Sequence, residues 1–313
     1  MRLVFLGSGR FAAPSLEHLY KRGLVPAAVI TQPDRPAGRG RRPASTPVKI
    51  MASALGLSVS QPGSIGAPET LAQLRDLDPD FLVVAAYGQI LTPEVLQVSR
   101  VAPINLHASL LPRWRGASPV ARAILAGDVR TGLTTMRMDA GIDTGDILLQ
   151  EEVEIGACET AGDLELRLAD LGGALLEQTL LGLQGGSLEP RPQPSEGVTQ
   201  APRLSVDEAR LEWSLAAEDL DRRVRAYNPR PVAWTDFGGQ RLKIWGSRPV
   251  TTPGDESPPE PGTVTIASGD TLRVACGRAA LDLLEIQPAG GRRCTARDAI
   301  NGRTLRKEDR LGA

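Results

Sequence analysis

Two side chains that can handle a proton and a negative charge stand two residues apart, at Asn105 and His107. The chain has only two histidines, and this one follows the short apolar run 101–104, after which the sequence changes to Ser, Pro, Arg and Gly. Such a change predicts a strand that ends in a loop, where parallel sheets place chemistry. A carboxamide can donate to an oxyanion, and an imidazole can act as acid or base. An isolated pair of this kind is also compatible with a structural histidine beside a capping asparagine.

A carboxylate that could join this pair stands in the loop 139–146, which is dense in Asp and Gly and follows a predicted strand at 131–138. If the sheet brings this loop beside His107, Asp143 can hold the imidazole in one tautomer and favour its charged form. Together with Asn105, these groups form a consistent set for acyl transfer to an amine. Such a transfer requires neither a metal nor a nucleophilic side chain. Asp143 could equally bond its own backbone in a turn, as Asp-x-Gly sequences do.

A serine nucleophile is the alternative chemistry, and Ser109 is the candidate. It lacks the G-x-S-x-G turn that exposes such a serine. We therefore expect Ser109 and Pro112 to shape the loop after His107 rather than to react.

The elements that must position these residues alternate between buried strands and amphipathic helices. Strands are predicted at 2–6, 26–30 and 81–86, and helices at 13–22 and 68–77, among others. This alternation predicts an α/β fold with a Rossmann-like domain built on a mainly parallel sheet.

The glycine-rich turn 7–12 after the first strand has the outline of a dinucleotide-binding start. A nicotinamide enzyme would place an acidic residue after the second strand to bind the ribose, but Thr31 and Gln32 stand there. The sequence therefore disfavours a dinucleotide oxidoreductase.

The segment 34–49 holds five cations against one acid, and its Gly and Pro content argues that it forms no regular structure. A short arginine-rich loop can be a solvated surface segment. It also has the composition of an arm that becomes ordered on phosphates.

The second half of the chain has a different composition. A Pro- and Gly-rich stretch predicts a linker, and brief strands separated by glycine turns then predict a small OB-like β-barrel. We expect a catalytic domain at 1–188, a linker at 189–206 and a β-barrel domain at 207–313.

Composition restricts the class of protein. Hydrophobic residues at 41% and charged residues at 23% indicate an ordinary globular protein, and a net charge of -1 argues against wholesale electrostatic binding of nucleic acid. Three scattered cysteines form no disulfide framework and no zinc motif. Without a long apolar stretch we expect no membrane association and a cytoplasmic location.

Several motifs match at once and resemble the family of formyltransferases that use 10-formyltetrahydrofolate. One set surrounds the residues above: Asn105-x-His107-x-Ser109-x-Leu111-Pro112, Arg113-Trp-Arg-Gly116, Asp143-Thr-Gly-Asp146 and the segment 85–91. A second set is similar to the branch of that family that acts on methionyl-tRNA: the segments 5–14, 225–231, 286–293 and 301–303. The chain departs from the family pattern at Gln200, Arg230 and Val232, in or near the RNA-facing half and away from the proposed chemistry.

The resemblance implies a reaction and a set of roles. The α-amine of initiator methionyl-tRNA would attack the formyl carbon of 10-formyltetrahydrofolate, the formyl-donating co-substrate, through a tetrahedral oxyanion and without a metal. Asn105, His107 and Asp143 would be catalytic. The folate site would comprise Tyr87, Gly88, Gln89, Ile90, Leu91, Ser109, Leu110, Leu111, Pro112 and Asp139. The tRNA-binding residues would be Arg39, Arg41, Arg42 and Lys49, with Arg42 foremost, and the protein would be a monomer.

Two rival functions remain open at this level. The same chemistry could serve another amine, such as an amino sugar nucleotide, or the fold could serve a catalytically silent RNA-binding protein. The basic segment 34–49 and the cations of the C-terminal half favour an RNA acceptor. Intact Asn105, His107 and Asp143 favour an enzyme.

Overall fold

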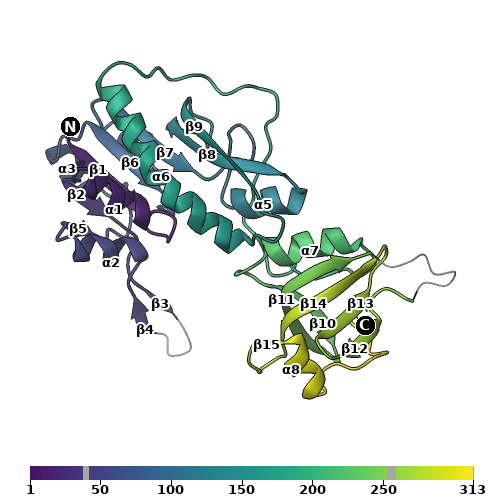
Figure 1. Ribbon diagram of the computed structural model, residues 1–313. Helices are drawn as coiled ribbons and strands as arrows, with labels where there is room; N and C mark the ends of the chain where they lie inside the picture. The colour runs from purple at the N-terminus through teal and green to yellow at the C-terminus, as the bar shows by residue number, and fades with distance from the viewer. Residues whose placement is uncertain (38–41, 252–258, 313) are drawn as a thin grey trace. The chain divides into compact units, whose positions relative to one another are not determined.

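The computed structural model describes residues 1–37, 42–251 and 259–312, which form two compact units (Figure 1). The N-terminal unit comprises Met1–Pro119, Arg130–Glu154 and Glu165–Ala201. The C-terminal unit comprises Val120–Val129, Ile155–Leu164 and the rest of the chain from Pro202. Each unit is assembled from several separate stretches of sequence, so this division does not test single boundaries along the chain. The boundaries expected at residues 188 and 207 stay predictions.

The N-terminal unit is built on a seven-stranded sheet in the order β5-β2-β1-β6-β7-β8-β9. The strands are β1 (Leu3–Gly7), β2 (Ala28–Ile30), β5 (Val59–Ser60), β6 (Phe81–Ala85), β7 (Ala102–His107), β8 (Arg130–Arg137) and β9 (Ile147–Glu154). The pairings from β5 to β7 are parallel, whereas β8 and β9 pair antiparallel. The mainly parallel sheet predicted from the sequence is confirmed.

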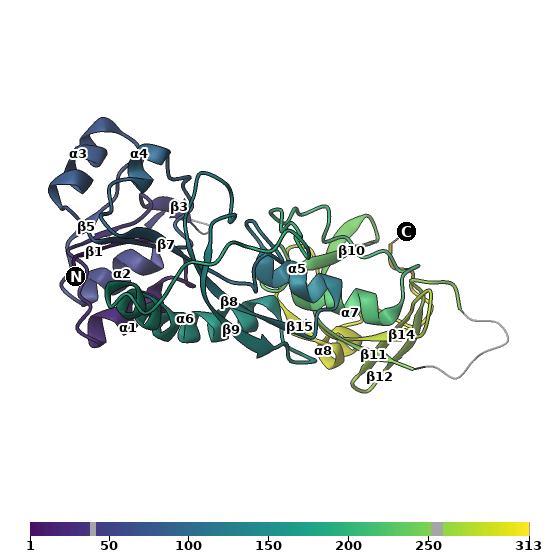
Figure 2. The same ribbon diagram turned by 90° about the horizontal axis from the view of Figure 1, so that it is seen from above.

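Helices cover both faces of this sheet, as Figure 2 shows. They are α1 (Ala13–Lys21), α2 (Pro47–Ala54), α3 (Pro68–Asp76), α4 (Pro93–Leu96) and α6 (Ala161–Gln184). Alternate residues of β1 and β6 form one core with Leu74 of α3 and Val95 of α4. On the other face Nε2 of His18 in α1 lies within hydrogen-bonding distance of a carboxylate oxygen of Glu177 in α6, at 2.7 Å. The central strands β1 and β6 are buried on both faces, which explains their continuous apolar sequences.

The basic segment contains structure that the sequence did not predict. β3 (Arg35–Ala37) and β4 (Arg42–Ala44) pair antiparallel, with Pro36 opposite Pro43. The expectation of no regular structure was therefore wrong for these residues. A two-stranded ribbon has two free edges, so prolines are tolerated in it as they would not be in a central strand.

The C-terminal unit is built on an antiparallel sheet in the order β10-β11-β14-β13-β12, with β15 beside β14. Its elements are α5 (Pro119–Ala126), α7 (Ala217–Ala226), β10 (Ala233–Phe237), β11 (Gln240–Val250), β12 (Val264–Ser268), β13 (Thr271–Ala275), β14 (Ala280–Gln287), β15 (Cys294–Thr295) and α8 (Ala296–Asn301). Its core contains Trp213, Leu220 and Ile286, so the unit has an apolar interior of its own.

The last residues of the chain join the two edge strands of this sheet. The backbone carbonyl of Asp309 accepts a hydrogen bond from the amide of Val264, the first residue of β12, at 2.9 Å. The amide of Gly312 donates to the carbonyl of Asp236 in β10 at 2.8 Å. The barrel-like β domain expected from the sequence is therefore confirmed as an antiparallel sheet whose edges are linked by its own C-terminal segment.

Within the described ranges, no helix is both long enough and apolar enough to cross a membrane.

Candidate active site

The sheet brings Asn105, His107 and Asp143 together at the end of β7. Asn105 and His107 are two residues apart on the strand, so their side chains project from the same face. β8 pairs antiparallel with β7, with Arg137, the last residue of β8, opposite Ile104, so the loop after β8 begins beside the residue that precedes Asn105. Asp143 lies in that loop. The expectation that the sheet would place Asp143 beside His107 agrees with this geometry.

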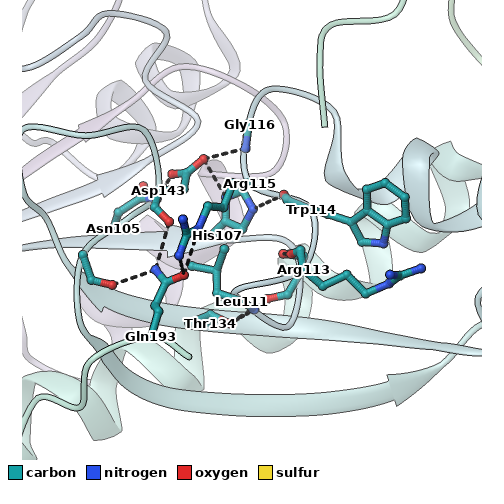
Figure 3. A network of polar contacts seen from close by, with 12 residues as sticks. Asn105, His107, Leu111, Arg113, Trp114, Arg115, Gly116, Thr134, Asp143 and Gln193 are labelled. Atoms are coloured by element: carbon teal, nitrogen blue, oxygen red, sulfur yellow. Dashed lines mark hydrogen bonds and ion pairs between the residues drawn. The ribbon is translucent and has the colours of Figure 1, made fainter. Parts of the chain in front are cut away.

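Asp143 is the shared partner of the group (Figure 3). Its Oδ2 accepts a hydrogen bond from the amide of Gly116 at 2.9 Å and lies 3.6 Å from Nδ1 of His107. Its Oδ1 accepts a long hydrogen bond of 3.5 Å from Nδ2 of Asn105. His107 is only 6% exposed, so water contributes little to its surroundings. The site thus holds a carboxamide, an imidazole and a carboxylate within a few ångströms.

The tautomer of His107 follows from its second contact. Nε2 of the ring lies 2.9 Å from the carbonyl oxygen of Trp114. A carbonyl only accepts hydrogen bonds, so Nε2 must carry a proton. In the neutral ring, Nδ1 is then an unprotonated nitrogen that faces Asp143. The carbonyl of Trp114, rather than Asp143, sets the tautomer, and it leaves Nδ1 available as a base.

The loops that carry this group are held in unusual backbone conformations. Asp143 and Trp114 have positive φ angles of 53° and 63°, in the left-handed region that residues with a side chain seldom adopt. Such a conformation costs about 1–3 kcal/mol and persists only where other contacts impose it. Gly145 supplies one such constraint, because a Cβ there would overlap the carbonyl oxygen of Arg137. The position of Asp143 is therefore imposed by its surroundings.

The residues after His107 shape the loop. Ser109 is fully buried and donates from Oγ to the carbonyl of Arg113 at 2.6 Å, while its own carbonyl accepts from Thr134. The amide of Leu111 donates to Oγ1 of Thr134 at 3.1 Å. Leu111 packs in a small core with Met136 and Ile147. Leu110 and Pro112 are half-buried. These bonds agree with a structural role for Ser109.

The segment 87–91 continues from β6 at the same edge of the sheet. Tyr87 and Leu91 are buried in the core, and burial raises the pKa of Tyr87 to about 12. Gln89 accepts from the amide of Ile65 at 2.7 Å. Gly88 has a positive φ of 87°, and Ile90 is 80% exposed. This segment thus presents a bare backbone and an exposed apolar side chain.

Two buried polar atoms near this segment have no partner among the described residues. They are the hydroxyl of Tyr87 and Nε2 of Gln32. Gln32 lies beside Gly88: a Cβ added to Gly88 would lie 4.0 Å from Nε2 of Gln32. Ser8 links the two loops: its Oγ donates to the carbonyl of Tyr87 and accepts from the amide of Gln32. An unpaired donor at this edge suits a ligand with an acceptor group.

The remaining candidates lie in other surroundings. Asp139 accepts bonds from the amide of Gly141 and from the hydroxyl of Thr144, so in this structure it braces its own loop. Lys49 lies in α2 and pairs with Asp34 at 2.7 Å. The hydrogen bond from Lys49, followed by one from Gln61, holds the pKa of Asp34 below its ordinary value.

Arg39 and Arg41 lie outside the described residues. Arg42 begins β4, but its side chain is outside them too. In the part of the chain that is described, no group of three or more His, Cys, Asp or Glu side chains is arranged to hold a metal ion.

Sequence reasoning missed three contributors to the site. The carbonyl of Trp114 and the amide of Gly116 are backbone atoms, which carry no signature in side-chain types. Gln193 donates from Nε2 to the carbonyls of Asp143 and Gly145 at 2.9 and 2.7 Å. It lies between two prolines in a stretch that reads as a linker. Several other polar residues stand in this stretch, so the amide side chain of Gln193 gave no distinguishing signal.

Comparison with known families gives two matches that together cover most of the chain. Residues 1–180 match the family model described as "Formyl transferase", and residues 203–304 match "Formyl transferase, C-terminal domain".

Individual relatives are similar over their whole length. The chain is 46% identical over 312 residues to a "Methionyl-tRNA formyltransferase" of Solibacter usitatus, covering 100% of this chain and 99% of the relative. It is 48% identical over 305 residues to the protein of that name from Methylococcus capsulatus, covering 97% and 98%.

Solved structures share the fold at lower identity. An N-formyltransferase from Helicobacter canadensis in complex with folinic acid and dTDP-3-aminofucose aligns with a TM-score of 0.66 at 18% identity, over 90% of this chain and 98% of that one. A methionyl-tRNA formyltransferase from Clostridium thermocellum aligns with a TM-score of 0.57 at 16% identity, over 79% and 93%.

The tautomer of His107 can be measured directly, because the only other histidine is His18. We expect neutral His107 to carry its proton on Nε2, since the carbonyl of Trp114 requires a donor there. Ring ¹⁵N spectra of selectively labelled protein distinguish the two tautomers, and a His18→Gln variant assigns the signals. An Nδ1-protonated ring in the folded protein would contradict this assignment.

Proposed function

This chain belongs to the formyl transferase family, and we propose that it is a methionyl-tRNA formyltransferase that uses 10-formyltetrahydrofolate as its formyl donor. The observation that carries the proposal is the meeting of Asn105, His107 and Asp143 at one strand end. Full-length relatives at 46–48% identity bear that name, which supports methionyl-tRNA as the acceptor.

The donor site fits a folate in two respects. Gly88 leaves its backbone open next to an unpaired amide nitrogen of Gln32, which can meet a polar edge of a ring. Ile90 is an exposed apolar side chain of the kind that packs on a flat ring. We assign residues 87–91 to the wall of this site, with 109–112 shaping its floor. The bound donor would supply the formyl group.

Asn105 is suited to stabilise the negative charge that develops on the formyl oxygen. Among the residues that the structure describes, its amide nitrogen makes one long contact of 3.5 Å, to Asp143, so it retains donor capacity. A fixed donor in a partly buried site stabilises such a charge without reorganising.

His107 is suited to take the proton that the attacking amine loses. Its Nε2 is held by Trp114, and its Nδ1 is the free basic nitrogen. When Nδ1 gains the proton, the carboxylate of Asp143 faces the new positive charge from 3.6 Å and stabilises it. The same nitrogen can then return the proton to the departing folate nitrogen.

The RNA acceptor is supported by cations in both units. The N-terminal unit carries the basic segment 34–49. In the C-terminal unit several arginines are paired with acids, among them Arg225 with Asp221. Exposed cations outside the described ion pairs of that unit are Arg203, Arg230, Arg241, Arg292, Arg303, Arg306 and Lys307. We propose that this second group contacts the phosphate backbone. We also propose a monomer.

The rival acceptor, an amino sugar nucleotide, rests on likeness of fold alone. The solved sugar-acting relative is 18% identical, against 46–48% for the relatives named after methionyl-tRNA. Fold is shared by enzymes with different acceptors, so this likeness does not favour a sugar.

One experiment tests the proposal. The protein is incubated with 10-formyltetrahydrofolate and methionyl-tRNA, and formylmethionine is measured after the ester is hydrolysed. A parallel reaction replaces the RNA with a dTDP-linked amino sugar. Formylmethionine in the first reaction and no product in the second is the expected result, and product only in the second would refute the methionyl-tRNA assignment.

Removing the donor at Asn105 should slow the chemical step. Asn105→Ala, and Asn105→Asp as a variant of the same shape, should lower kcat by about 10²–10³, because each lacks the amide N–H. Single-turnover formylation checks the rate, and filter binding checks that methionyl-tRNA still binds. A rate within threefold of wild type in both variants would remove the oxyanion role.

Removing a cation from the basic segment should weaken the use of RNA. Arg42→Ala should lower kcat/KM for methionyl-tRNA and reduce the slope of its logarithm against the logarithm of salt concentration by about one, because one phosphate contact is lost. Lys21→Ala is the matched control, since Lys21 is an exposed cation of α1 paired with Glu17. If both variants keep the wild-type slope, the segment is only a solvated surface.

A further inference from the structure

We propose that the segment 191–201, which we call the strap, is a working part of the active site, and that Gln193 is a positioning residue for Asp143. The strap contains no helix or strand and lies just before the chain enters the C-terminal unit at Pro202. This inference rests on the proposed function for its catalytic consequence. Its structural part stands on contacts within the N-terminal unit alone.

Gln193 connects the loop that carries Asp143 with Arg115 in the loop 113–118. Its Nε2 donates to the carbonyls of Asp143 and Gly145, at 2.9 and 2.7 Å. Its Oε1 accepts from Nε and from a terminal nitrogen of Arg115, at 3.0 and 2.7 Å. Figure 3 shows Gln193 beside the loop that carries Asp143. Every hydrogen-bonding atom of this carboxamide is therefore in use, and two of its bonds are charge-assisted.

The bond to Asp143 acts where the backbone needs support. Asp143 has a positive φ of 53°, a conformation that the chain does not adopt by preference. Gln193 holds the carbonyl of this residue and that of Gly145 with one amide group, which fixes the peptide units 143–144 and 145–146. Gln193 thereby fixes the carboxylate that faces His107 by holding the backbone of Asp143 in place.

The rest of the strap secures the second loop, 113–118. The amide of Trp114 donates to Oγ1 of Thr199 at 2.8 Å, and the amide of Arg115 donates to the carbonyl of Thr199 at 2.9 Å. Trp114 is the residue whose carbonyl sets the tautomer of His107. The strap therefore fixes the backbone on both sides of the imidazole–carboxylate pair.

The two ends of the strap are also anchored by backbone bonds. Arg191 and Ile147 exchange two hydrogen bonds, at 2.8 and 2.9 Å. The carbonyl of Ala201 accepts from the amide of Ser118 at 3.1 Å. A Cβ on Gly116 would lie 2.7 Å from that carbonyl oxygen, so the strap passes too close to Gly116 for any side chain. A tether that only joined two domains would need none of these contacts.

The test replaces Gln193 in the full-length chain. Gln193→Leu keeps the size and removes all polar contacts. Gln193→Glu keeps an acceptor for Arg115 but removes the donor to Asp143 and Gly145. We expect both variants to lower kcat for formylation of methionyl-tRNA by about 10–100-fold, because a small displacement of a catalytic group costs rates of this size. The KM values for both substrates should stay within about twofold of wild type.

The matched control is Glu196→Gln, an exposed position in the same strap, which should leave kcat unchanged. Arg115→Ala combined with Gln193→Leu should cost little more than the worse single variant, since both residues belong to one network. Unchanged kcat in Gln193→Leu overturns the proposal. So does full kcat in Gln193→Glu, because the bond to Arg115 alone would then suffice. A fall in kcat that disappears when rates are normalised to the folded fraction also overturns it.

A second measurement needs no activity and separates this inference from the proposed function. Amide hydrogen exchange in segments 113–118 and 139–146 should be faster in Gln193→Leu than in wild type, while exchange in β6 stays the same. Equal exchange in those two segments of Gln193→Leu and wild type would refute the proposal that Gln193 holds the two loops. If wild-type protein does not formylate methionyl-tRNA but the exchange difference is present, the proposed function is wrong. The structural role of Gln193 in the strap is then still supported.

Discussion

The antiparallel pairing of β8 with β7 is the constraint on which the site depends. If β7 had only parallel neighbours, Asn105 and His107 would lie beside the loops that follow β1 and β6. Among the described contacts, no carboxylate of those loops faces the imidazole. Arg137, the last residue of β8, lies opposite Ile104, so the loop that follows starts beside Asn105 and carries Asp143 along β7 to the ring. The chemistry therefore arises at the junction between the parallel and antiparallel parts of the sheet.

The site is held mainly by main-chain atoms. The carbonyl of Trp114 orients His107, and the amide of Gly116 orients Asp143. Backbone groups cannot rotate away or be lost by substitution, so they keep the imidazole and carboxylate in register. Under the proposed mechanism, the side chains of Asn105 and His107 make the contacts that change during the reaction: they donate to a developing charge and exchange a proton.

Much of this arrangement could be predicted from the sequence. Buried strands gave continuous apolar runs, and the two-residue spacing of Asn105 and His107 placed them on one face. The pairing of β3 and β4 could not be predicted, because Pro and Gly argue against strands in isolation. The tautomer of His107 and the contacts of Gln193 were also beyond prediction. They depend on which backbone atoms meet in space, and residue types do not encode that.

The path of the strap affects how this protein can be divided or recombined. The first family model ends at residue 180, which suggests a natural place to cut the chain. A fragment ending there would keep the sheet and the catalytic side chains but would lack Gln193 and Thr199. Chimaeras that exchange the C-terminal unit should therefore join after Ala201, so that each catalytic unit keeps its own strap. A recombinant joined earlier would inherit a foreign strap along with its foreign C-terminal unit.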